Sequence, residues 1–451
     1  MHSFRRVAAL AALALVPLAG PVSQVSAHAD TAVGGSFSTL NYNVAGLPVV
    51  HEPPTTLSME DAATAIGQRI GSGGYDLVNM QEDFNYHAYI YAGDTTHAYR
   101  TATSGAAGIG DGLNTVSNYA WDGDDFERDK WSSCYPDNGD CITPKGFSFM
   151  RWRVAEGDYI DVYNIHTNAG TSSGDETARE NEWTQLSSFI STHSAGNAVI
   201  VMGDTNSRYT RTADQLQNFV ATNGLTDAWV QLEMGGTAPA AGASPLMCDE
   251  AAITNTCEIT NKTLYRSSAL INLTPTYYNN DHAGFLDGNG AMLSDMDPIQ
   301  VNFNWSQSSN YKLTDQFGGP HGDYYNDINS VPAGEKATTL TLRSGSRVDN
   351  VALTLANGAT LAHGGTGGTA SSLTLGSGEY VTSAYLCEAE YSGHTRIFYA
   401  KFTTNLGNTL AGGSTTSDCT TLSAPSGWQL AGFDGRSGDE VDKLGLIFTK
   451  V

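Results

Sequence analysis

Polar side chains that can bind a metal ion or move a proton stand next to apolar, strand-like runs in the N-terminal part of the chain. These residues are Asn43, Glu82, His166, Asp204, Asn206 and Asp295. Carboxylate oxygens such as those of Glu82 and Asp295 suit Mg²⁺ or a similar divalent cation. The imidazole of His166 can act as an acid, a base or a hydrogen-bond donor to phosphate. Phosphodiester cleavage requires this combination of a metal ion for the phosphoryl group, a base for water and donors for the developing charge.

The runs that carry these residues must form strands of a sheet if the side chains are to meet. Strand-like runs cover 36–44, 75–80, 159–165, 198–202 and 298–303, and helical spacing covers 57–71 and 177–191. Because strand ends gather at one edge of a sheet, residues far apart in the sequence can converge there. Strands interleaved with helices predict a layered α/β domain.

Each of these residues also has an ordinary structural explanation when it is taken alone. A glutamate at a strand end is most often a solvated edge residue, and a single histidine is more often structural than catalytic. The ordered set of strand ends is much more specific than any of its members. The functional hypothesis therefore depends on the set.

The chain is strongly acidic, with a formal net charge of −24 that becomes −26 when Arg5 and Arg6 are removed with the expected leader. Such a field repels polyanions at long range, and the sequence lacks a basic stripe for non-specific nucleic-acid binding. A bound divalent cation can reverse the sign of the field locally. Nucleic acid is therefore not expected as the partner, whereas a small or lipid phosphodiester is compatible with the charge.

The first residues, 1–29, have the pattern of a signal peptide. Arg5 and Arg6 supply positive charge, residues 7–18 are apolar, and Ala27-His28-Ala29 fits the small-x-small rule before a cleavage site. The alternative is a membrane anchor, but the apolar stretch is short for a span of roughly 20 residues. We therefore predict a secreted, extracellular protein.

Six cysteines are present, an even number that suggests disulfide bonds in a secreted chain. Pairing of sequence neighbours would join Cys134 with Cys141 and Cys248 with Cys257, and would leave Cys387 with Cys419. Other connectivities stay open. A cysteine metal site is the alternative, and it lacks the tight C-x-x-C spacing.

The residue pattern of the sequence changes after Trp305, which indicates a second domain in a chain of 451 residues. A polar stretch begins there and predicts a linker at 306–316. Beyond it, short β-type runs alternate with glycine-rich turns, and the runs are 337–342, 351–355, 380–386 and 397–402. Regular short strands separated by glycine turns predict an all-β domain.

The ordered segments of the first domain, 30–305, resemble the endonuclease/exonuclease/phosphatase family. The segments are Asn41-Tyr42-Asn43-Val44, Asn79-Met80-Gln81-Glu82, Tyr163-Asn164-Ile165-His166, Met202-Gly203-Asp204-Thr205-Asn206 and Leu293-Ser294-Asp295. The resemblance implies a four-layered α/β sandwich, in which helices flank two β-sheets, and Mg²⁺ or another divalent cation as cofactor. It also implies that Asn43 and Glu82 are metal-site residues. The catalytic residues implied by the same resemblance are His166, Asp204, Asn206 and Asp295.

Two segments are similar to the secreted sphingomyelinase and phospholipase C branch of that family. They are Asn43-Val44-Ala45-Gly46-Leu47-Pro48 and Gly112-Leu113-Asn114-Thr115-Val116-Ser117, with Lys145-Gly146-Phe147 in support. This similarity implies a hydrolase that acts on lipid phosphodiesters and contacts a membrane surface. The acidic charge agrees with that branch better than with a nuclease.

The last motif departs from the family pattern. Family members have a histidine general base directly after Ser-Asp, where this chain has Met296, and the aspartate that supports that histidine is Asn261 here. A thioether cannot take a proton from water at neutral pH. Three possibilities follow: a weakened enzyme that relies on the metal, replacement of the base by a residue such as His282, or binding of a phosphodiester without turnover.

The C-terminal region, 317–451, resembles a jacalin-type lectin domain. The segments that carry the resemblance are Phe317-Gly318-Gly319-Pro320-His321-Gly322, residues 342–349, residues 363–368 and residues 432–447. The resemblance implies an all-β prism of three sheets that binds carbohydrate at one end. The sugar would be held by backbone N–H groups near Gly319 or Gly322 and by the loop from Gly438 to Asp442. The ordinary alternative is that these glycines only form turns.

These features together predict a secreted, metal-dependent phosphoric diester hydrolase of phospholipid-type substrates that its lectin domain targets to glycans. Two alternatives stay open. One is a glycan-binding protein with a catalytically weakened or vestigial domain, and the other is a deoxyribonuclease-type endonuclease.

Overall fold

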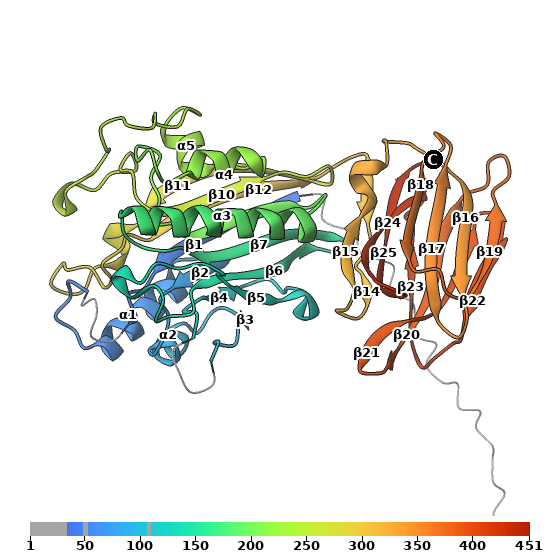
Figure 1. Cartoon of the computed structure of the whole chain (residues 1–451), viewed down its shortest axis with the longest axis horizontal. Helices are drawn as coiled ribbons and strands as arrows, with labels where there is room; N and C mark the ends of the chain where they lie inside the picture. Colours follow the sequence, from blue (N-terminus) through green and yellow to red (C-terminus); the bar gives the residue numbers. More distant parts are fainter. Residues whose placement is uncertain (1–33, 48–52, 106–109) are drawn as a thin grey trace, which may run out of the picture. The chain divides into compact units, whose positions relative to one another are not determined.

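Two six-stranded β-sheets form the centre of the N-terminal region in the computed structural model, which describes residues 34–47, 53–105 and 110–451 (Figure 1). The first sheet has the order β11 (Ile271–Asn280), β12 (Ile299–Gln307), β1 (Gly34–Asn43), β2 (Leu77–Gln81), β4 (Asn114–Ser117) and β3 (Tyr99–Arg100). The second has the order β5 (Glu127–Lys130), β6 (Gly146–Ala155), β7 (Asp158–His166), β8 (Ala198–Asp204), β10 (Asn261–Arg266) and β9 (Thr226–Asp227). The signal peptide predicted at 1–29 lies outside the described residues.

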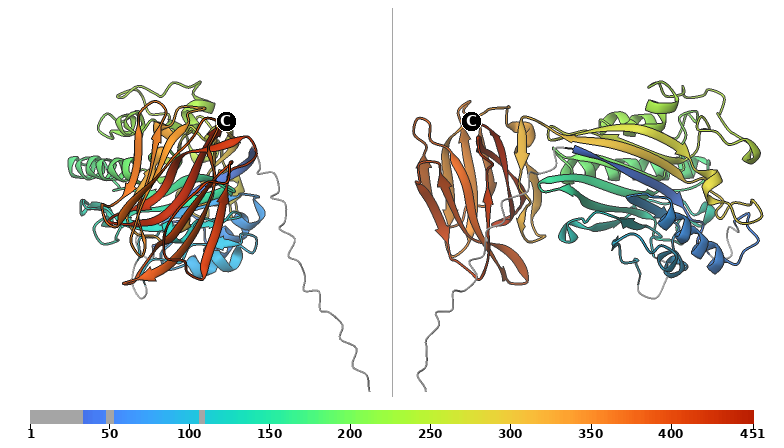
Figure 2. Two further views of the ribbon diagram at one scale, coloured as in Figure 1. Left: turned by 90° about the vertical axis from the view of Figure 1, so that its right-hand side faces the viewer. Right: turned by 180° about the vertical axis from the view of Figure 1, so that it is seen from behind.

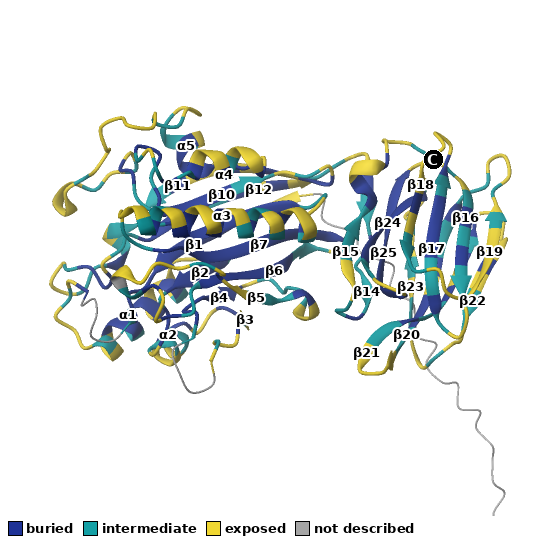
Figure 3. Ribbon diagram, viewed as in Figure 1, coloured by how far each residue is buried: buried dark blue, intermediate teal, exposed yellow. Residues whose placement is uncertain are grey.

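Helices flank both sheets. They are α1 (Met59–Ser72), α2 (His87–Gly93), α3 (Ser173–His193), α4 (Leu216–Thr222) and α5 (Ala228–Glu233), with 3₁₀ turns η1 (Gly123–Asp125), η2 (Asp137–Gly139), η3 (Glu250–Ala252), η4 (His282–Phe285) and η5 (Asp327–Ser330). Ile66 of α1 is buried with Val78 of the first sheet, and Leu186 of α3 is buried with Ile200 of the second. Figure 2 shows the layers from two further sides, and Figure 3 shows that the outer faces of the helices are exposed. The α/β sandwich with two sheets and flanking helices confirms the predicted fold class.

Capping side chains explain where the two longest helices begin. Ser58 accepts a hydrogen bond from the backbone N–H of Asp61 (3.1 Å) at the start of α1. Ser172 accepts from the N–H of Asp175 (3.4 Å), whose carboxylate accepts from the N–H of Ser172 (2.9 Å). The apolar spacing predicts this second helix from residue 177. It begins earlier, at Ser173, because the reciprocal capping box satisfies the first N–H groups.

Buried amide side chains join the two sheets across the centre of the sandwich. Asn41 of β1 donates from Nδ2 to the carbonyl oxygens of Gly203 (3.0 Å) and Lys262 (3.1 Å) in the second sheet. Asn164 of β7 donates in the opposite direction, to the carbonyl oxygen of Met80 (3.0 Å) in the first sheet. Because a polar group buried in a core must be hydrogen-bonded, these amides fix how the two sheets lie against each other.

The C-terminal region consists of three β-sheets. The five-stranded sheet has the order β13 (Tyr311–Leu313), β25 (Val441–Lys450), β24 (Trp428–Ser437) and β15 (Asp323–Asn326), and β14 (Phe317–Gly318) pairs with β25. The second sheet has the order β18 (Thr360–Gly364), β17 (Val348–Leu355), β16 (Ala337–Ser344) and β19 (Thr369–Thr374). The third has the order β22 (Thr409–Gly413), β21 (His394–Thr404), β20 (Val381–Tyr391) and β23 (Asp418–Ser423). Their inward side chains, such as Leu353, Phe402 and Phe433, share one core. This arrangement confirms the predicted all-β prism.

The segment predicted as a linker, 306–316, is partly β-strand. β12 continues to Gln307, and β13 pairs with β25 of the five-stranded sheet. Tyr311 anchors β13, since its ring is buried and its hydroxyl donates to the carbonyl oxygen of Val331 (2.7 Å). The polar composition predicted an irregular connection, but one buried aromatic residue and backbone pairing are enough to hold this short strand. The domain boundaries on either side stay predictions.

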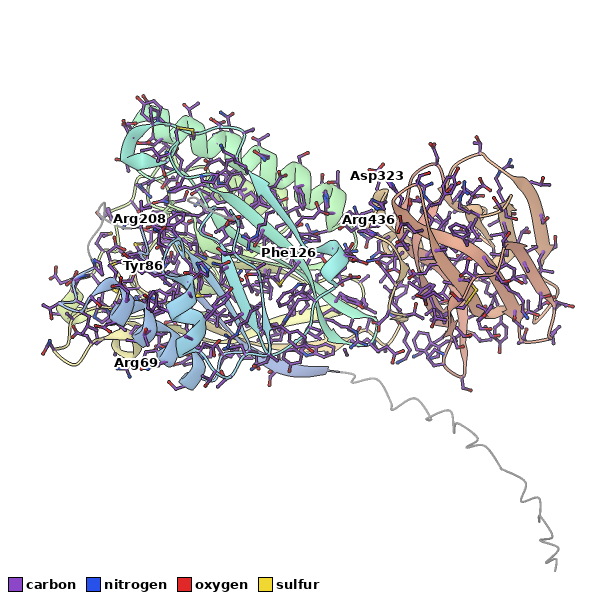
Figure 4. All side chains as sticks on the ribbon, turned by 90° about the horizontal axis from the view of Figure 1, so that it is seen from below. Arg69, Tyr86, Phe126, Arg208, Asp323 and Arg436 are labelled. Carbon is purple, nitrogen blue, oxygen red and sulfur yellow. A yellow bond between two sulfur atoms is a disulfide. The ribbon has the colours of Figure 1, made fainter. Side chains whose placement is uncertain are left out.

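A buried carboxylate, Asp125 of η1, connects the sandwich to the five-stranded sheet. Asp125 lies 3.6 Å from Arg151, 3.0 Å from Arg436 and 3.3 Å from Lys443. Burial raises the pKa of Asp125, but the three cations more than offset this, so that its pKa lies below the ordinary value. Figure 4 labels Arg436 and also Phe126, which directly follows Asp125 in the sequence. Removing one member of this group would leave a buried charge uncompensated.

The three disulfide bonds join the cysteine pairs predicted from sequence proximity. They are Cys134–Cys141, Cys248–Cys257 and Cys387–Cys419.

Among the residues that the structure describes, no helix has both the length and the apolar character required to cross a membrane.

Replacing Asn164 with leucine should destabilise the sandwich by about 2–4 kcal/mol, because buried carbonyl groups of the first sheet lose their donor. Denaturation in urea, followed by tryptophan fluorescence, measures this free energy of unfolding. Asn289→Leu, at an exposed position, is the matched control and should change it by less than about 0.5 kcal/mol. An equally small effect of Asn164→Leu would show that the amides do not hold the sheets together.

Candidate functional site

Four strands carry polar residues to one edge of the sandwich. β1 is parallel to β2, and β7 is parallel to β8, so their carboxyl ends lie together. Asn43 and His166 stand two positions beyond the bridging residues Asn41 and Asn164. Since side chains two positions apart in a strand share a face, the same inner face that joins the sheets also carries the candidate site.

Asn43 lies between two carboxylates. Its Nδ2 donates to Oε1 of Glu82 (2.9 Å) and to Oδ2 of Asp204 (3.2 Å), and its Oδ1 accepts from the N–H of Ala45 (3.0 Å). The bond from Ala45 sets the orientation of the amide, with its nitrogen toward the acids. The resemblance implied that Asn43 belongs to the metal site. In this arrangement its oxygen is engaged by the backbone, and the residue orients the two carboxylates.

His166 completes this group from β7. Its Nε2 lies 3.8 Å from Oε1 of Glu82 and 3.8 Å from Oδ2 of Asp204. The ring is buried, and burial together with the positive charge of Lys145 lowers the pKa of His166 well below its usual value. The imidazole is therefore neutral at pH 7 and can donate one hydrogen bond and accept another.

The backbone of Glu82 has an unusual conformation. Its φ of 55° lies in the left-handed region, as does the φ of 45° at Asn206. Residues with a Cβ occupy that region at a cost and often do so at functional sites. Burial raises the pKa of Glu82, while the hydrogen bond from Asn43 and the charge of Lys145 partly counter that rise.

Asn206 fixes Asp204 from the other side. The N–H of Asn206 donates to Oδ1 of Asp204 (3.0 Å), and its Nδ2 donates to the carbonyl oxygen of Thr167 (3.0 Å). Asp204 thus receives one donor on each carboxylate oxygen, from Asn206 and from Asn43. This arrangement leaves Asp204 little freedom to rotate.

Asp295 reaches the site through the segment before β12. The hydroxyl of the preceding Ser294 donates to the carbonyl oxygen of Asn43 (2.7 Å), which ties this segment to the end of β1. The negative charge of Asp295 contributes to the raised pKa of Glu82. The structure therefore brings all six sequence-predicted residues of this domain to one region.

A pocket of about 220 Å³ lies beside that region. Its lining includes Ser294, Asp295, Met296, Asp297, His282 and Arg208. Met296 stands where the family has a histidine, and the nearby imidazole in this pocket is His282. Its Nδ1 lies 2.9 Å from Oδ1 of Asp297.

The chain around Asp297 holds that pair. Oδ2 of Asp297 accepts from Nδ2 of Asn280 (2.9 Å), and its carbonyl oxygen accepts from Nδ2 of Asn261 (2.8 Å). Asn261 therefore supports the backbone of the segment that bears Asp297. The sequence pattern pointed to His282 and missed Asp297, because the two residues meet only through the loop between β11 and β12.

The donor set suits a divalent cation. Glu82 and Asp204 approach one amide nitrogen, and Asp295 adds a further negative charge nearby. In the described part of the chain, no group of three or more His, Cys, Asp and Glu side chains is arranged so that it could hold a metal ion. Buried acids without sufficient counter-charge are unfavourable. A cation held by Glu82, with water or substrate oxygens as further ligands, would offset that cost.

The structure also brings together the residues that the sequence predicted for a carbohydrate site in the second domain. The N–H of Gly319 donates to the carbonyl oxygen of Asp442 (2.9 Å), and the N–H of Gly438 donates to that of Glu440 (3.0 Å). A Cβ at Gly322 would lie 2.5 Å from Oδ2 of Asp442, so glycine allows this close approach. Burial raises the pKa of Asp442 to about 6. We call this group of loops around Asp442 the lectin cradle.

Both domains match known protein families. Residues 54–251 match the family described as Endonuclease/Exonuclease/phosphatase family 2, and residues 314–447 match the Jacalin-like lectin domain. The chain therefore joins an endonuclease/exonuclease/phosphatase domain to a jacalin-like lectin domain.

Individual relatives divide between the two regions. A sphingomyelinase of Mycobacterium bovis is 36% identical over 279 residues, which are 60% of this chain and 54% of that protein. Horcolin of Hordeum vulgare is 28% identical over 137 residues, which are 29% of this chain and 92% of horcolin. The chain thus spans about half the length of the sphingomyelinases that it matches.

Solved structures divide in the same way. Sphingomyelinase C from Streptomyces griseocarneus shares 15% identity, with a TM-score of 0.40, and covers 59% of this chain and 99% of its own. Malaysian banana lectin shares 25% identity, with a TM-score of 0.28, and covers 31% of this chain and 98% of its own.

Glu82→Gln should raise the urea midpoint of unfolding at pH 7 in the absence of a divalent cation. A carboxyl whose pKa rises on folding stabilises the fold while it is protonated and loses that contribution as the pH rises toward its folded pKa. At pH 4 the gain from Glu82→Gln should therefore be smaller. Glu180→Gln, exposed on α3, is the control, and a lower midpoint for Glu82→Gln at pH 7 would contradict the interpretation.

Proposed function

We propose that this protein is a secreted, metal-dependent phosphodiesterase that hydrolyses phospholipid-type phosphodiesters, and that its lectin domain directs it to glycan-bearing surfaces. The observation that carries the proposal is the Asn43 amide that joins Glu82 and Asp204, with Nε2 of His166 3.8 Å from each acid. The similarity to sphingomyelinases over 60% of the chain supports the substrate class.

Each group has a task in this reaction. A divalent cation held at Glu82 would polarise a phosphoryl oxygen when it is bound. Neutral His166 can donate a hydrogen bond to phosphate without adding charge to the site. Asp204, which is held by hydrogen bonds from Asn43 and Asn206, would orient the attacking water.

The pair of His282 and Asp297 supplies a base in place of the expected histidine. Asp297 lies at Nδ1 of His282 and so stabilises the imidazolium that forms when the ring takes a proton from water. His282 shares the pocket lining with Asp295 and Met296. This geometry favours replacement of the base over its loss.

Two exposed apolar residues support a lipid surface as the partner. Ile142 directly follows Cys141 and is 77% exposed, and Met247 directly precedes Cys248 and is 56% exposed. Each of these side chains lies directly beside a short disulfide-closed loop, and the cross-linked cysteine restrains the backbone next to it. Met247 also lines the pocket that contains Asp295.

The mature chain with Mg²⁺ should release phosphocholine from sphingomyelin vesicles, at a higher rate than it hydrolyses soluble bis(4-nitrophenyl) phosphate. His166→Gln should lower the rate about 10²–10⁴-fold, and Asn289→Leu should not change it. Phosphocholine release with and without EDTA is the measurement, with glycerophospholipid vesicles alongside. Plasmid nicking without lipid hydrolysis would instead favour the deoxyribonuclease alternative.

A second candidate function is glycan binding with a weakened catalytic domain, which Met296 favours. His282→Gln separates the two, because loss of a working base should lower kcat about 10²–10⁴-fold with little change in KM and remove one limb of the pH profile. His87→Gln on α2 is the matched control. An unchanged kcat in His282→Gln, together with a rise when Met296→His is combined with Asn261→Asp, would support the weakened enzyme.

A further inference from the structure

A single amide side chain contacts both members of the His282–Asp297 pair. The Oδ1 of Asn280, the last residue of β11, accepts a hydrogen bond from the backbone N–H of His282 (3.2 Å). Its Nδ2 donates to Oδ2 of Asp297 (2.9 Å). Because one planar amide makes both bonds, its position sets how the imidazole and the carboxylate lie relative to each other. Asn280 therefore controls the geometry of the pair.

That geometry decides which ring nitrogen can take a proton. A carboxylate only accepts hydrogen bonds, so the Nδ1 that lies 2.9 Å from Oδ1 of Asp297 carries the hydrogen in the neutral ring. The Nε2 of His282 is then the acceptor that a base requires. If Asp297 moved away, the ring would lose the partner that fixes this tautomer.

The backbone of Asn280 is bound by a loop that the disulfide bond Cys248–Cys257 closes. The N–H of Asn280 donates to Oδ1 of Asn255 in this loop (2.9 Å). The Nδ2 of Asn255 donates to the carbonyl oxygen of Tyr278 (2.9 Å), two residues earlier in the same strand. The amide of Asn255 thus holds the end of β11 at two points.

The disulfide bond matters for this loop because the loop contributes almost nothing to a core. Within residues 248–257, all of which the structure describes, Cys257 alone is buried. The N–H of Cys257 donates to the carbonyl oxygen of Thr254 (3.1 Å), and Nε1 of Trp229 donates to that of Asn255 (2.8 Å). A loop without buried side chains keeps one conformation when a cross-link and hydrogen bonds restrain it.

The other support of His282 lies in the core. The carboxylate of the preceding Asp281 accepts from the hydroxyl of the buried Tyr75 (2.5 Å) and from Nδ2 of Asn279 (3.2 Å). The N–H of Asp281 donates to the carbonyl oxygen of Pro298 (2.9 Å). These bonds do not involve the disulfide-closed loop, so a displaced loop would misalign the pair without unfolding η4.

We propose that Asn255 and Asn280 are positioning residues for the proposed reaction, and that the disulfide-closed loop keeps them in place. Asn255 acts through Asn280, which in turn orients His282. The proposal rests on the proposed function, in which His282 is the base. Loss of this support should lower turnover and leave substrate binding intact, because other strands position the acids and His166.

Asn255→Ala should lower kcat for phosphocholine release from sphingomyelin vesicles about 10-fold with little change in KM, as expected when a residue that orients a catalytic group is lost. Asn255→Asp keeps the acceptor for the N–H of Asn280 and should recover most of that loss. Cys248→Ser combined with Cys257→Ser should cause a similar loss, and adding Asn255→Ala should cause little more. Ala251→Ser, exposed in the same loop, is the matched control and should leave kcat unchanged.

The tautomer of His282 tests the positioning without any turnover. Long-range ¹H–¹⁵N spectra of the histidine-labelled mature chain, at a pH where the ring is neutral, should show the Nδ1–H tautomer in wild type and in Asn255→Asp. Asn255→Ala should show a mixture of tautomers. His282→Gln assigns the signal, and the signal of His97, whose Nδ1 lies 2.9 Å from Asp94, should be the same in every variant.

An active wild type whose Asn255→Ala variant keeps the tautomer of His282 would overturn the positioning role and leave the proposed function intact. Thermal melts should show that each variant is folded. If wild type releases no phosphocholine, the proposed function fails, and the spectra alone decide whether the loop orients His282. A mixture of tautomers in Asn255→Ala would then support that orientation, and an unchanged tautomer would contradict it.

Discussion

The hydrogen bonds that buried asparagines make between the two sheets are the constraint on which the site depends. Asn41 and Asn164 donate across the sandwich in opposite directions, so neither sheet can slide without leaving buried groups unpaired. Asn43 and His166 follow them at the two-residue spacing of a strand. The bonds that hold the fold together therefore also set the distances between the acids and the imidazole. A site placed on strand ends inherits the rigidity of the sheets, while the loops beyond it are free to vary.

The electrostatics of the site run against the stability of the fold. Glu82, Asp204 and Asp295 lie close together in a chain that is already strongly acidic. Burial raises the pKa of Glu82, and the lowered pKa of His166 shows that no compensating positive charge develops on the imidazole. Lys145 supplies part of the missing charge and is itself paired with Asp140 at 2.5 Å. A divalent cation would neutralise the group and, with it, the long-range repulsion of an anionic substrate.

The sequence predicted the parts of this structure that local pattern determines. Alternating apolar runs identified β1, β7 and β8, and their polar ends identified the site residues, because a strand that ends at a sheet edge presents its last side chains there. The pattern could not show that Asn43 faces its nitrogen to the acids, since that depends on a bond from Ala45. It also missed Asp297, whose contact with His282 is made by a loop. The sequence also did not predict the strand β13, because the residues around it are polar and the strand is held by backbone pairing.

The lectin cradle is flanked by Arg436 and Lys443, which both form ion pairs with the buried Asp125 of the sandwich. Any movement of its loop must therefore disturb a network in which an unpaired charge is costly. A glycan bound at the lectin cradle would therefore contact a loop whose position is set by charges that the sandwich compensates.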